Sequence, residues 1–162
     1  MCKQGLFKFK DMLGKLRSFA KKIGSIDQNK LVKEVFNSPI LEAQIIDLNQ
    51  DQLFNKGIQA DGTPTGEYAY NTIFGTSKYA GKIQKGQRYD HITGKDTGAS
   101  YESMDVVAKE DKLVMQSKFP NSFLERLPDA LGLTNESFKQ IRPEIKERYV
   151  ELFKKKVRTG AL

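Results

Sequence analysis

Residues 39–57 read Pro-Ile-Leu-Glu-Ala-Gln-Ile-Ile-Asp-Leu-Asn-Gln-Asp-Gln-Leu-Phe-Asn-Lys-Gly, a long pattern in which apolar residues recur with a helical period. Pro39 suits the first position of a helix, and Ser38 precedes it as the expected cap. Lys56 is followed by Gly57, a residue that commonly ends helices. We therefore predict one long helix that starts at Pro39 and closes at Gly57, with its apolar side chains on one face: Ile40, Leu41, Ile45, Ile46, Leu48, Leu53 and Phe54.

Two further helices are predicted before this one. The nearer begins at Asp27 or Gln28 and carries apolar residues as far as Phe36. The other, in residues 6–23, has one apolar stripe among lysines, and Gly24-Ser25 interrupts it. Such a basic amphipathic helix lies on a membrane surface or packs against its own domain or a neighbouring subunit, and we favour packing. We divide the chain into this helix, residues 1–26, and a single domain, residues 27–162.

The sequence pattern changes after the long helix. From Ile58 to Gly98, glycines interrupt a stretch rich in Thr, Tyr, Asp and Lys, and no period is sustained. Asp61-Gly62 and the following residues 63–66 are turn signals. A segment of about 40 residues without regular structure is unusual in a compact domain and generally indicates a functional loop or a part that orders on binding. We expect its contacts to be with other chains.

The remaining residues predict a β-hairpin and three helices. A strand is expected over 101–108, with Met104, Val106 and Ala108 facing inward, and a returning strand over 113–117 after a polar turn. A helical hairpin starting near Phe123 follows. In it Thr134 caps a helix that ends at Ile141, and Pro143 starts the last helix. The predicted class is α+β, with N-terminal helices, a long glycine-rich loop, an antiparallel β-hairpin or small sheet and C-terminal helices.

Charge is distributed unevenly along the chain. The 162 residues include 27 Lys and Arg against 20 Asp and Glu, which gives a formal net charge of +7. The excess lies in the first third and in the last turns. This pattern favours polyanions or acidic protein surfaces, although a solvated helix face explains it equally well. The candidate polyanion-facing residues are Lys15, Arg17, Lys21, Lys22, Lys154, Lys155, Lys156 and Arg158.

Residues that could carry chemistry are few. Cys2 is the only cysteine and His91 the only histidine, so they cannot supply the three or four N or S ligands of a zinc site. We expect His91 to be a structural hydrogen-bonding residue, and loop carboxylates such as Asp61 and Asp90 to bond to nearby backbone amides. No run reaches the roughly 20 apolar residues that span a bilayer. We expect a soluble protein without catalytic residues, metal or cofactor.

Four segments between residues 45 and 157 occur in a recognisable order. The first is 52–68, which combines a helix end, Gly57, Asp61-Gly62 and a Gly66-x-Tyr68 passage. The second is Tyr-Asn-Thr-Ile, 70–73, and the third is Asp-Thr-Gly-Ala-Ser-Tyr-Glu-Ser-Met, 96–104. The fourth is 131–137, before a closing amphipathic helix. Together they resemble the virion-morphogenesis or tail-completion (neck) proteins of tailed bacteriophages, particularly those of phages and prophages of Bacteroidota.

The resemblance implies a non-enzymatic structural protein at the head–tail junction or tail of a virion. It implies assembly in the bacterial cytoplasm, as an oligomer or ring, with portal, adaptor or tail proteins. A ring with heterologous contacts needs two different complementary surfaces on each copy. By this resemblance the interaction loop includes Gly57, Asp61, Gly62, Gly66, Tyr68, Asp96, Thr97, Gly98 and Tyr101.

Two other interpretations remain open. The first is a basic nucleic-acid-binding module of a phage or mobile element, which the net charge allows but for which no known reader motif is present. The second, which we favour least, is a small hydrolase that works through an aspartate and His91.

Overall fold

Helix α3 (Pro39–Asp51) is the element on which the core is built. The computed structural model describes residues 17–109, 113–120, 124, 127 and 129–159. α3 continues through a π-helical turn, η1 (Gln52–Lys56), to Gly57, whose left-handed backbone (φ 62°) ends it. The predicted long helix is therefore confirmed. Ser38 stands at the cap position, but the prediction that it caps is wrong because its side chain makes no capping hydrogen bond. Proline at the next position has no N–H, so this start of the helix has one unpaired donor fewer.

The helices before α3 are also confirmed within the described residues. Residues 17–24 are helical, and Ser25 closes this segment through its amide to the Lys21 carbonyl (3.1 Å) and its hydroxyl to the Lys22 carbonyl (2.8 Å). α2 (Gln28–Phe36) starts where predicted because Asp27 caps it, accepting from the amides two and three residues on at 2.9 and 3.1 Å. The boundary between residues 26 and 27 as a domain limit stays a prediction.

The hairpin is shorter than predicted. β1 (Met104–Ala108) and β2 (Leu113–Ser117) pair antiparallel, from Met104 opposite Ser117 to Ala108 opposite Leu113. Met104 and Val106 face the core as expected, and Ala108 is half-buried. The expectation of a strand over 101–103 is wrong: these residues belong to a helical turn, α5 (Ala99–Glu102), and its C-cap. The Gly98 carbonyl explains the difference, because it accepts from the amides of both Tyr101 (2.9 Å) and Glu102 (3.0 Å).

The last helix, α6 (Asn135–Thr159), is a single helix where two were predicted. Thr134 caps it as expected, accepting from the Ser137 amide at 3.1 Å. Pro143 lies inside α6 instead of starting a new helix. Both Pro143 and Lys139, one turn before it, are exposed, so the carbonyl that loses its partner can bond to water. Leu124 is in a 3₁₀ turn, and much of the first helix predicted here lies outside the described residues, including Phe123.

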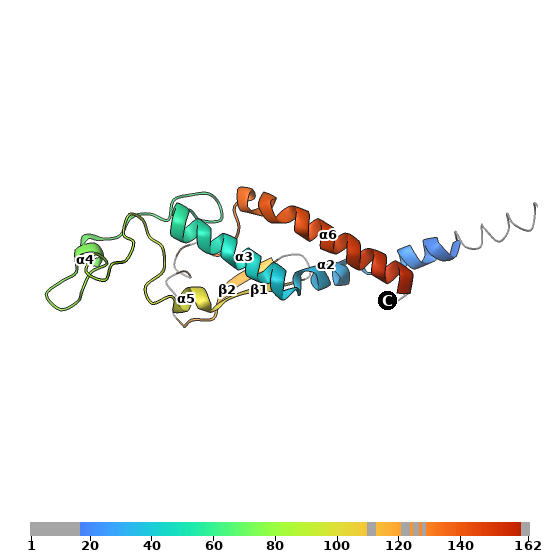
Figure 1. Cartoon of the computed structure of the whole chain (residues 1–162), viewed down its shortest axis with the longest axis horizontal. Helices are drawn as coiled ribbons and strands as arrows, with labels where there is room; N and C mark the ends of the chain where they lie inside the picture. Colours follow the sequence, from blue (N-terminus) through green and yellow to red (C-terminus); the bar gives the residue numbers. More distant parts are fainter. Residues whose placement is uncertain (1–16, 110–112, 121–123, 125–126, 128, 160–162) are drawn as a thin grey trace, which may run out of the picture.

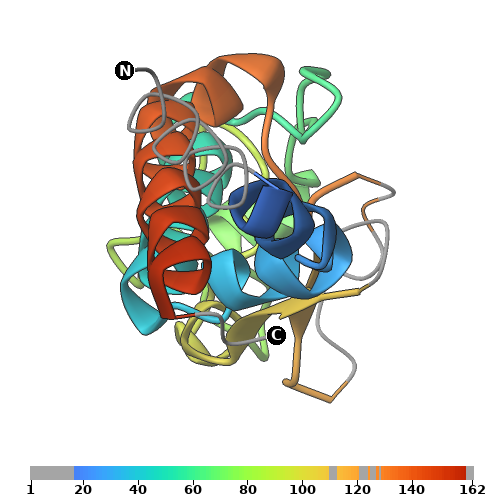
Figure 2. The same cartoon turned by 90° about the vertical axis from the view of Figure 1, so that its right-hand side faces the viewer.

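α3 packs against α6 on one side and against the hairpin on another (Figures 1 and 2). One buried cluster joins these three elements and α2: Val35, Leu41, Ile45, Val106 and Ile141. A second cluster lies toward the C-terminal end of α3: Leu53, Tyr101, Met104, Leu124 and Ala130. Burying each large apolar side chain contributes roughly 1.5–3 kcal/mol. The class is α+β, as predicted.

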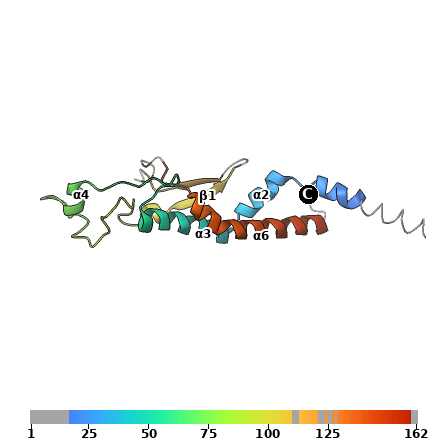
Figure 3. The same cartoon turned by 90° about the horizontal axis from the view of Figure 1, so that it is seen from above.

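Residues 58–98, which we call the arm, extend from the end of η1 beyond the helices. The arm lies at one end of an elongated molecule, and the segment 17–24 lies at the other (Figures 1 and 3). Its regular structure is limited to one short helix, α4 (Tyr70–Phe74), and an isolated bridge between Ile58 and Pro64. The prediction of a long segment with little regular structure is confirmed.

Candidate functional site

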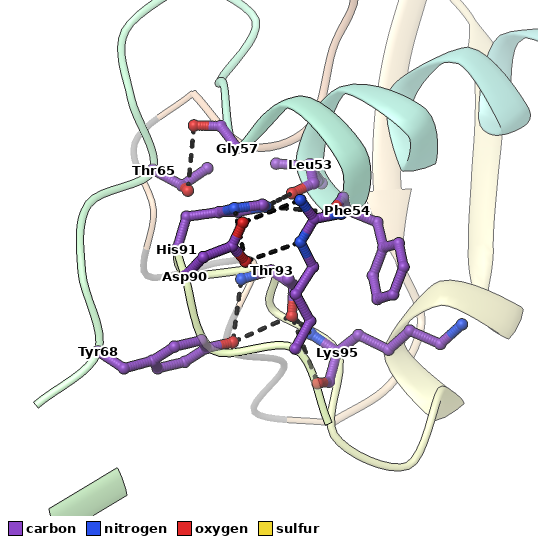
Figure 4. A network of polar contacts seen from close by, with 10 residues as sticks. Leu53, Phe54, Gly57, Thr65, Tyr68, Asp90, His91, Thr93 and Lys95 are labelled. Atoms are coloured by element: carbon purple, nitrogen blue, oxygen red, sulfur yellow. Dashed lines mark hydrogen bonds and ion pairs between the residues drawn. The ribbon is translucent and has the colours of Figure 1, made fainter. Parts of the chain in front are cut away.

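His91 fastens the arm to the end of the long helix (Figure 4). Its Nε2 lies 3.1 Å from the Leu53 carbonyl and 3.0 Å from the Phe54 carbonyl. Carbonyl oxygens only accept, so Nε2 carries the proton and donates. The last four carbonyls of a helix lack partners within it, and His91 satisfies two carbonyls of the final turn. Asp90 Oδ1 lies 3.2 Å from the other ring nitrogen, Nδ1.

Gly57 allows the histidine to come this close. A Cβ at Gly57 would stand 2.6 Å from both Cδ2 and Cγ of His91, nearer than any real Cβ contact. The Gly57 carbonyl also accepts from Thr65, at 2.8 Å from its amide and 3.2 Å from its hydroxyl. Gly57 was selected from the sequence as a motif residue, and the structure gives it two tasks, a left-handed turn and a close approach.

Arg88 adds to the contacts that hold the arm to the end of the helix. We call these contacts, made by Arg88, Asp90, His91, Thr93 and Tyr101, the anchor. Its guanidinium donates to both oxygens of Asp90, at 2.7 and 2.9 Å. This hydrogen-bonded pair holds the pKa of the Asp90 carboxyl well below its usual range. The guanidinium also lies 5.8 Å from the centre of the Phe54 ring, a cation–π distance. Arg88, Asp90 and His91 therefore link residues 88–91 of the arm to the last turn of the helix.

A second group of contacts centres on Thr93, which is almost fully buried. The Thr93 amide donates to the Tyr68 hydroxyl at 2.9 Å, and the two hydroxyls are 3.0 Å apart. The Tyr101 hydroxyl donates to the Thr93 carbonyl, and burial raises the pKa of the Tyr101 phenol. The motif residues Gly57, Tyr68 and Tyr101, distant in sequence, are thus brought together through His91 and Thr93.

The other motif residues shape turns. Asp61 Oδ1 accepts from the Thr63 amide at 2.9 Å and its hydroxyl at 2.7 Å, and these bonds lower the pKa of Asp61. Asp96 is held by Gln87 at 2.9 Å and Lys85 at 3.2 Å. The remaining positions set the backbone: Gly62, Gly66 and Gly98 have positive φ, and the Thr97 hydroxyl accepts from the next amide but one. These residues support the arm and do not gather into one site.

The outer surface of the arm was not singled out from the sequence. Tyr70 and Tyr79 are 71% and 75% exposed, and Phe74 and Ile83 are 46% and 41% exposed. We call these residues, together with Lys78 and Lys85, the arm tip. The sequence did contain a pattern that could have indicated this surface. Residues 68–89 contain four cations, Lys78, Lys82, Lys85 and Arg88, and no carboxylate.

Lys82 is a buried cation beneath the tip. It is only 7% exposed, and its ammonium donates to Gln87 Oε1 at 3.3 Å and to the Lys95 carbonyl at 3.2 Å. The same ammonium lies 4.5 Å from the centre of the Tyr68 ring. The contacts of the Lys82 ammonium therefore lie inside the arm, where they join Gln87, Lys95 and the Tyr68 ring.

The structure brings together parts of the two basic segments. A groove of about 380 Å³ is lined by Lys22 and Phe19 from the segment 17–24 and by Arg158 from the end of α6. Lys154 and Lys155 line the neighbouring surface with Arg158. Lys156 differs from the others, since its ammonium is 2.8 Å from Glu34 and links α6 to α2. Of the other candidates, Arg17 and Lys21 are exposed in the segment 17–24, and Lys15 lies outside the described residues.

The described part of the chain contains no group of three or more His, Cys, Asp or Glu that could hold a metal ion. None of its helices has both the length and the apolar character needed to cross a membrane. The candidate site is thus the arm with its anchor, and the basic groove at the far end is a second surface. Comparisons with protein-family models, with curated proteins and with solved structures gave no match to this chain.

Proposed function

We propose that this chain is a non-enzymatic structural subunit of a tailed-bacteriophage virion, at the head–tail junction or in the tail. In this role it acts by assembling with copies of itself and with portal, adaptor or tail proteins. The observation that carries the proposal is the arm, a projection with a fixed interior and an exposed aromatic tip. Large apolar groups gathered on a projecting surface are typical of a protein–protein contact.

The anchor supports the same conclusion. A loop that served only as a connection would not need the contacts of His91, Thr93 and Tyr101 that hold the arm in place. Binding surfaces that are already ordered lose less entropy on association. Three residues of the phage resemblance, Gly57, Tyr68 and Tyr101, meet at the anchor through His91 and Thr93. The resemblance and the geometry therefore concern the same part of the molecule.

The first test is the solution mass of the purified chain, measured by size exclusion with light scattering at several concentrations and at low and high salt. We expect an oligomer, and a ring would give one mass that does not grow further with concentration. Mass spectrometry of purified virions that contain the chain's gene should then detect it among the virion proteins. A strict monomer that binds a short DNA duplex tightly would contradict the proposal.

A second function is favoured by the basic groove between Lys22 and Arg158. Contacts of Lys and Arg with phosphates bind DNA without reading its bases, and this binding weakens steeply with salt. The groove would then be a nonspecific DNA contact, either beside a DNA channel in an assembly or in a separate nucleic-acid-binding module. Fluorescence anisotropy of a labelled duplex at increasing salt tests it. Absence of binding at low salt would exclude both forms.

A further inference from the structure

A groove of about 510 Å³ runs between α3 and α6, and its charged residues are all acidic. Asp47 and Asp51 line it from α3, and Glu144 lines it from α6. Asp51 is paired with Lys56 at 3.2 Å. Within the described part of the chain, Asp47 and Glu144 have no ion-pair partner.

The groove also contains an unsatisfied acceptor. Gln44 lines it, and Gln44 Oε1 is buried without a hydrogen-bond partner among the described residues. A buried acceptor without a partner costs about 1–3 kcal/mol. If the Gln44 amide turns toward the groove, a donor bound there removes this cost. Leu48 and Ile141, also in the lining, offer apolar contact beside the carboxylates.

The arm tip has the complementary chemistry. It comes from residues 68–89, which hold cations and no carboxylate. Lys78 is exposed and has no ion pair among the described residues, and its neighbour Tyr79 is 75% exposed. The ammonium of Lys78 suits the carboxylates of the groove, and the tyrosine ring suits its apolar residues.

Tip and groove of one copy are well separated. In Figures 1 and 3, α4 lies beyond the end of α3, away from α6. A contact between these surfaces therefore joins two copies. It uses different surfaces on the two partners, so it is heterologous and repeats into a ring or an open filament.

We infer that the arm tip of one copy docks in the acidic α3–α6 groove of the next copy, through Lys78 and Tyr79 on one side and Asp47 and Glu144 on the other. The inference rests on the proposed assembly function and identifies its self-contact. Charge complementarity of this kind fixes the partner and the register of an interface.

The test uses two double variants of the full chain. The groove variant carries Asp47→Asn and Glu144→Gln, and the tip variant carries Lys78→Gln and Tyr79→Ser. The matched control carries Lys146→Gln and Glu147→Gln, at two exposed positions of α6 outside the groove. Circular dichroism and thermal unfolding establish that all three are folded. Light scattering at low salt then gives the mass of each.

We expect the wild type and the control to form the same oligomer. Each double variant should weaken the contact at least tenfold and shift the mass toward the 18.4 kDa monomer. Each variant keeps one intact surface, so an equimolar mixture should form a species of twice the monomer mass that grows no further. This halted dimer is specific to a heterologous contact between these two surfaces.

Three results would overturn the docking. If both variants keep the oligomer of the wild type, the docking is wrong although assembly itself holds. If the tip variant loses binding to single-stranded DNA while its mass stays unchanged, the tip contacts nucleic acid instead. If the wild type is monomeric at every concentration, this self-contact does not exist, and the virion and duplex-binding measurements decide the proposed function separately.

Discussion

At the scale of single residues, the arm depends on a close approach at Gly57. The His91 ring lies against the backbone at this position, and its Nε2 reaches the carbonyls of Leu53 and Phe54 at 3.1 and 3.0 Å. Any side chain at residue 57 would have to push the ring away or bend the helix end. The direction in which the arm leaves the helix is therefore set by the absence of one Cβ atom.

Gly57→Ala is expected to destabilise the protein for two reasons. The backbone φ of 62° is unfavourable for alanine, and the new Cβ would stand 2.6 Å from the His91 ring. Gly62→Ala is the control, because its φ of 87° is also unfavourable but nothing lies within 4 Å of the new Cβ. We expect a loss of about 1 kcal/mol for the control and about 2–4 kcal/mol for Gly57→Ala in urea unfolding. Equal losses of stability in the two variants would show that the His91 ring moves away from the new Cβ at little cost.

The Asp90 carboxylate gives the anchor an acid dependence. Its pKa in the folded protein is lowered by Arg88, so its ionised form favours the folded state. This contribution is present above the ordinary aspartate pKa of about 4 and is lost as the pH falls below it toward the lower folded pKa. The free energy of unfolding of the wild type should therefore exceed that of Asp90→Asn at pH 6, and the difference should shrink below about pH 4.

Arg88→Gln provides the matched variant for this measurement. It removes the partner and leaves the carboxylate. When Arg88 is already replaced, Asp90→Asn should therefore change the free energy of unfolding less, and this change should depend less on pH. Urea unfolding from pH 2.5 to pH 6 on the wild type, the two single variants and the double variant gives the coupling between the residues. A coupling that does not change with pH would contradict the role given to the ionised carboxylate.

At the scale of elements, two buried polar side chains of the long helix position the start of α6. Asn49 and Gln52 are fully buried. The Asn49 amide donates to the carbonyls of residues 130 and 132 at 2.8 and 2.6 Å. Gln52 accepts from the Thr134 amide at 2.9 Å and donates to the carbonyl of residue 132 at 3.0 Å. The segment that leads into α6 is thus held by hydrogen bonds from α3 and η1.

The Thr134 cap is the last step of this connection. Thr134→Ala removes the acceptor that the Ser137 amide uses at 3.1 Å, and we expect a loss of about 1 kcal/mol in the free energy of unfolding. Thr134→Ser keeps the hydroxyl and should stay within about 0.5 kcal/mol of the wild type. Urea unfolding at 25 °C distinguishes them. If the serine variant is as unstable as the alanine variant, the threonine methyl contributes more than the cap does.

The sequence predicted the elements that follow local rules. The long helix and the second strand follow from the periodicity of the sequence, and the starts of α2 and α6 follow from capping by Asp27 and Thr134. Nearby residues determine both signals. The sequence did not single out Asn49 and Gln52, whose burial depends on backbone groups about 80 residues away in the chain. It also placed a strand start at Tyr101, where the Gly98 carbonyl closes a helical turn. At the site, the prediction that His91 is a structural hydrogen-bonding residue is confirmed, but its partners were not predicted, because these contacts span 37 and 38 residues and no local pattern reveals them.

At the scale of the whole molecule, cationic surfaces lie at both ends. The arm tip occupies one end, and the groove between Lys22 and Arg158 lies at the other (Figure 1). Their chemistry differs. The tip combines exposed aromatic rings with Lys78, whereas the groove at the far end draws on a surface rich in lysine and arginine. The first composition suits a protein surface, and the second suits a phosphate backbone.

This difference predicts that one variant can weaken DNA binding without affecting assembly, and that another can weaken assembly without affecting DNA binding. Lys22→Gln with Arg158→Gln removes two phosphate contacts, so the slope of log binding constant against log salt should fall by roughly 2 for a duplex. The solution mass should not change. The tip variant should do the reverse, lowering the mass at low salt while keeping the slope of the wild type. Anisotropy and light scattering on the same samples give both values. Loss of both properties in either variant would mean that DNA binding and assembly use one surface, and the two ends would then not have the separate roles assigned to them.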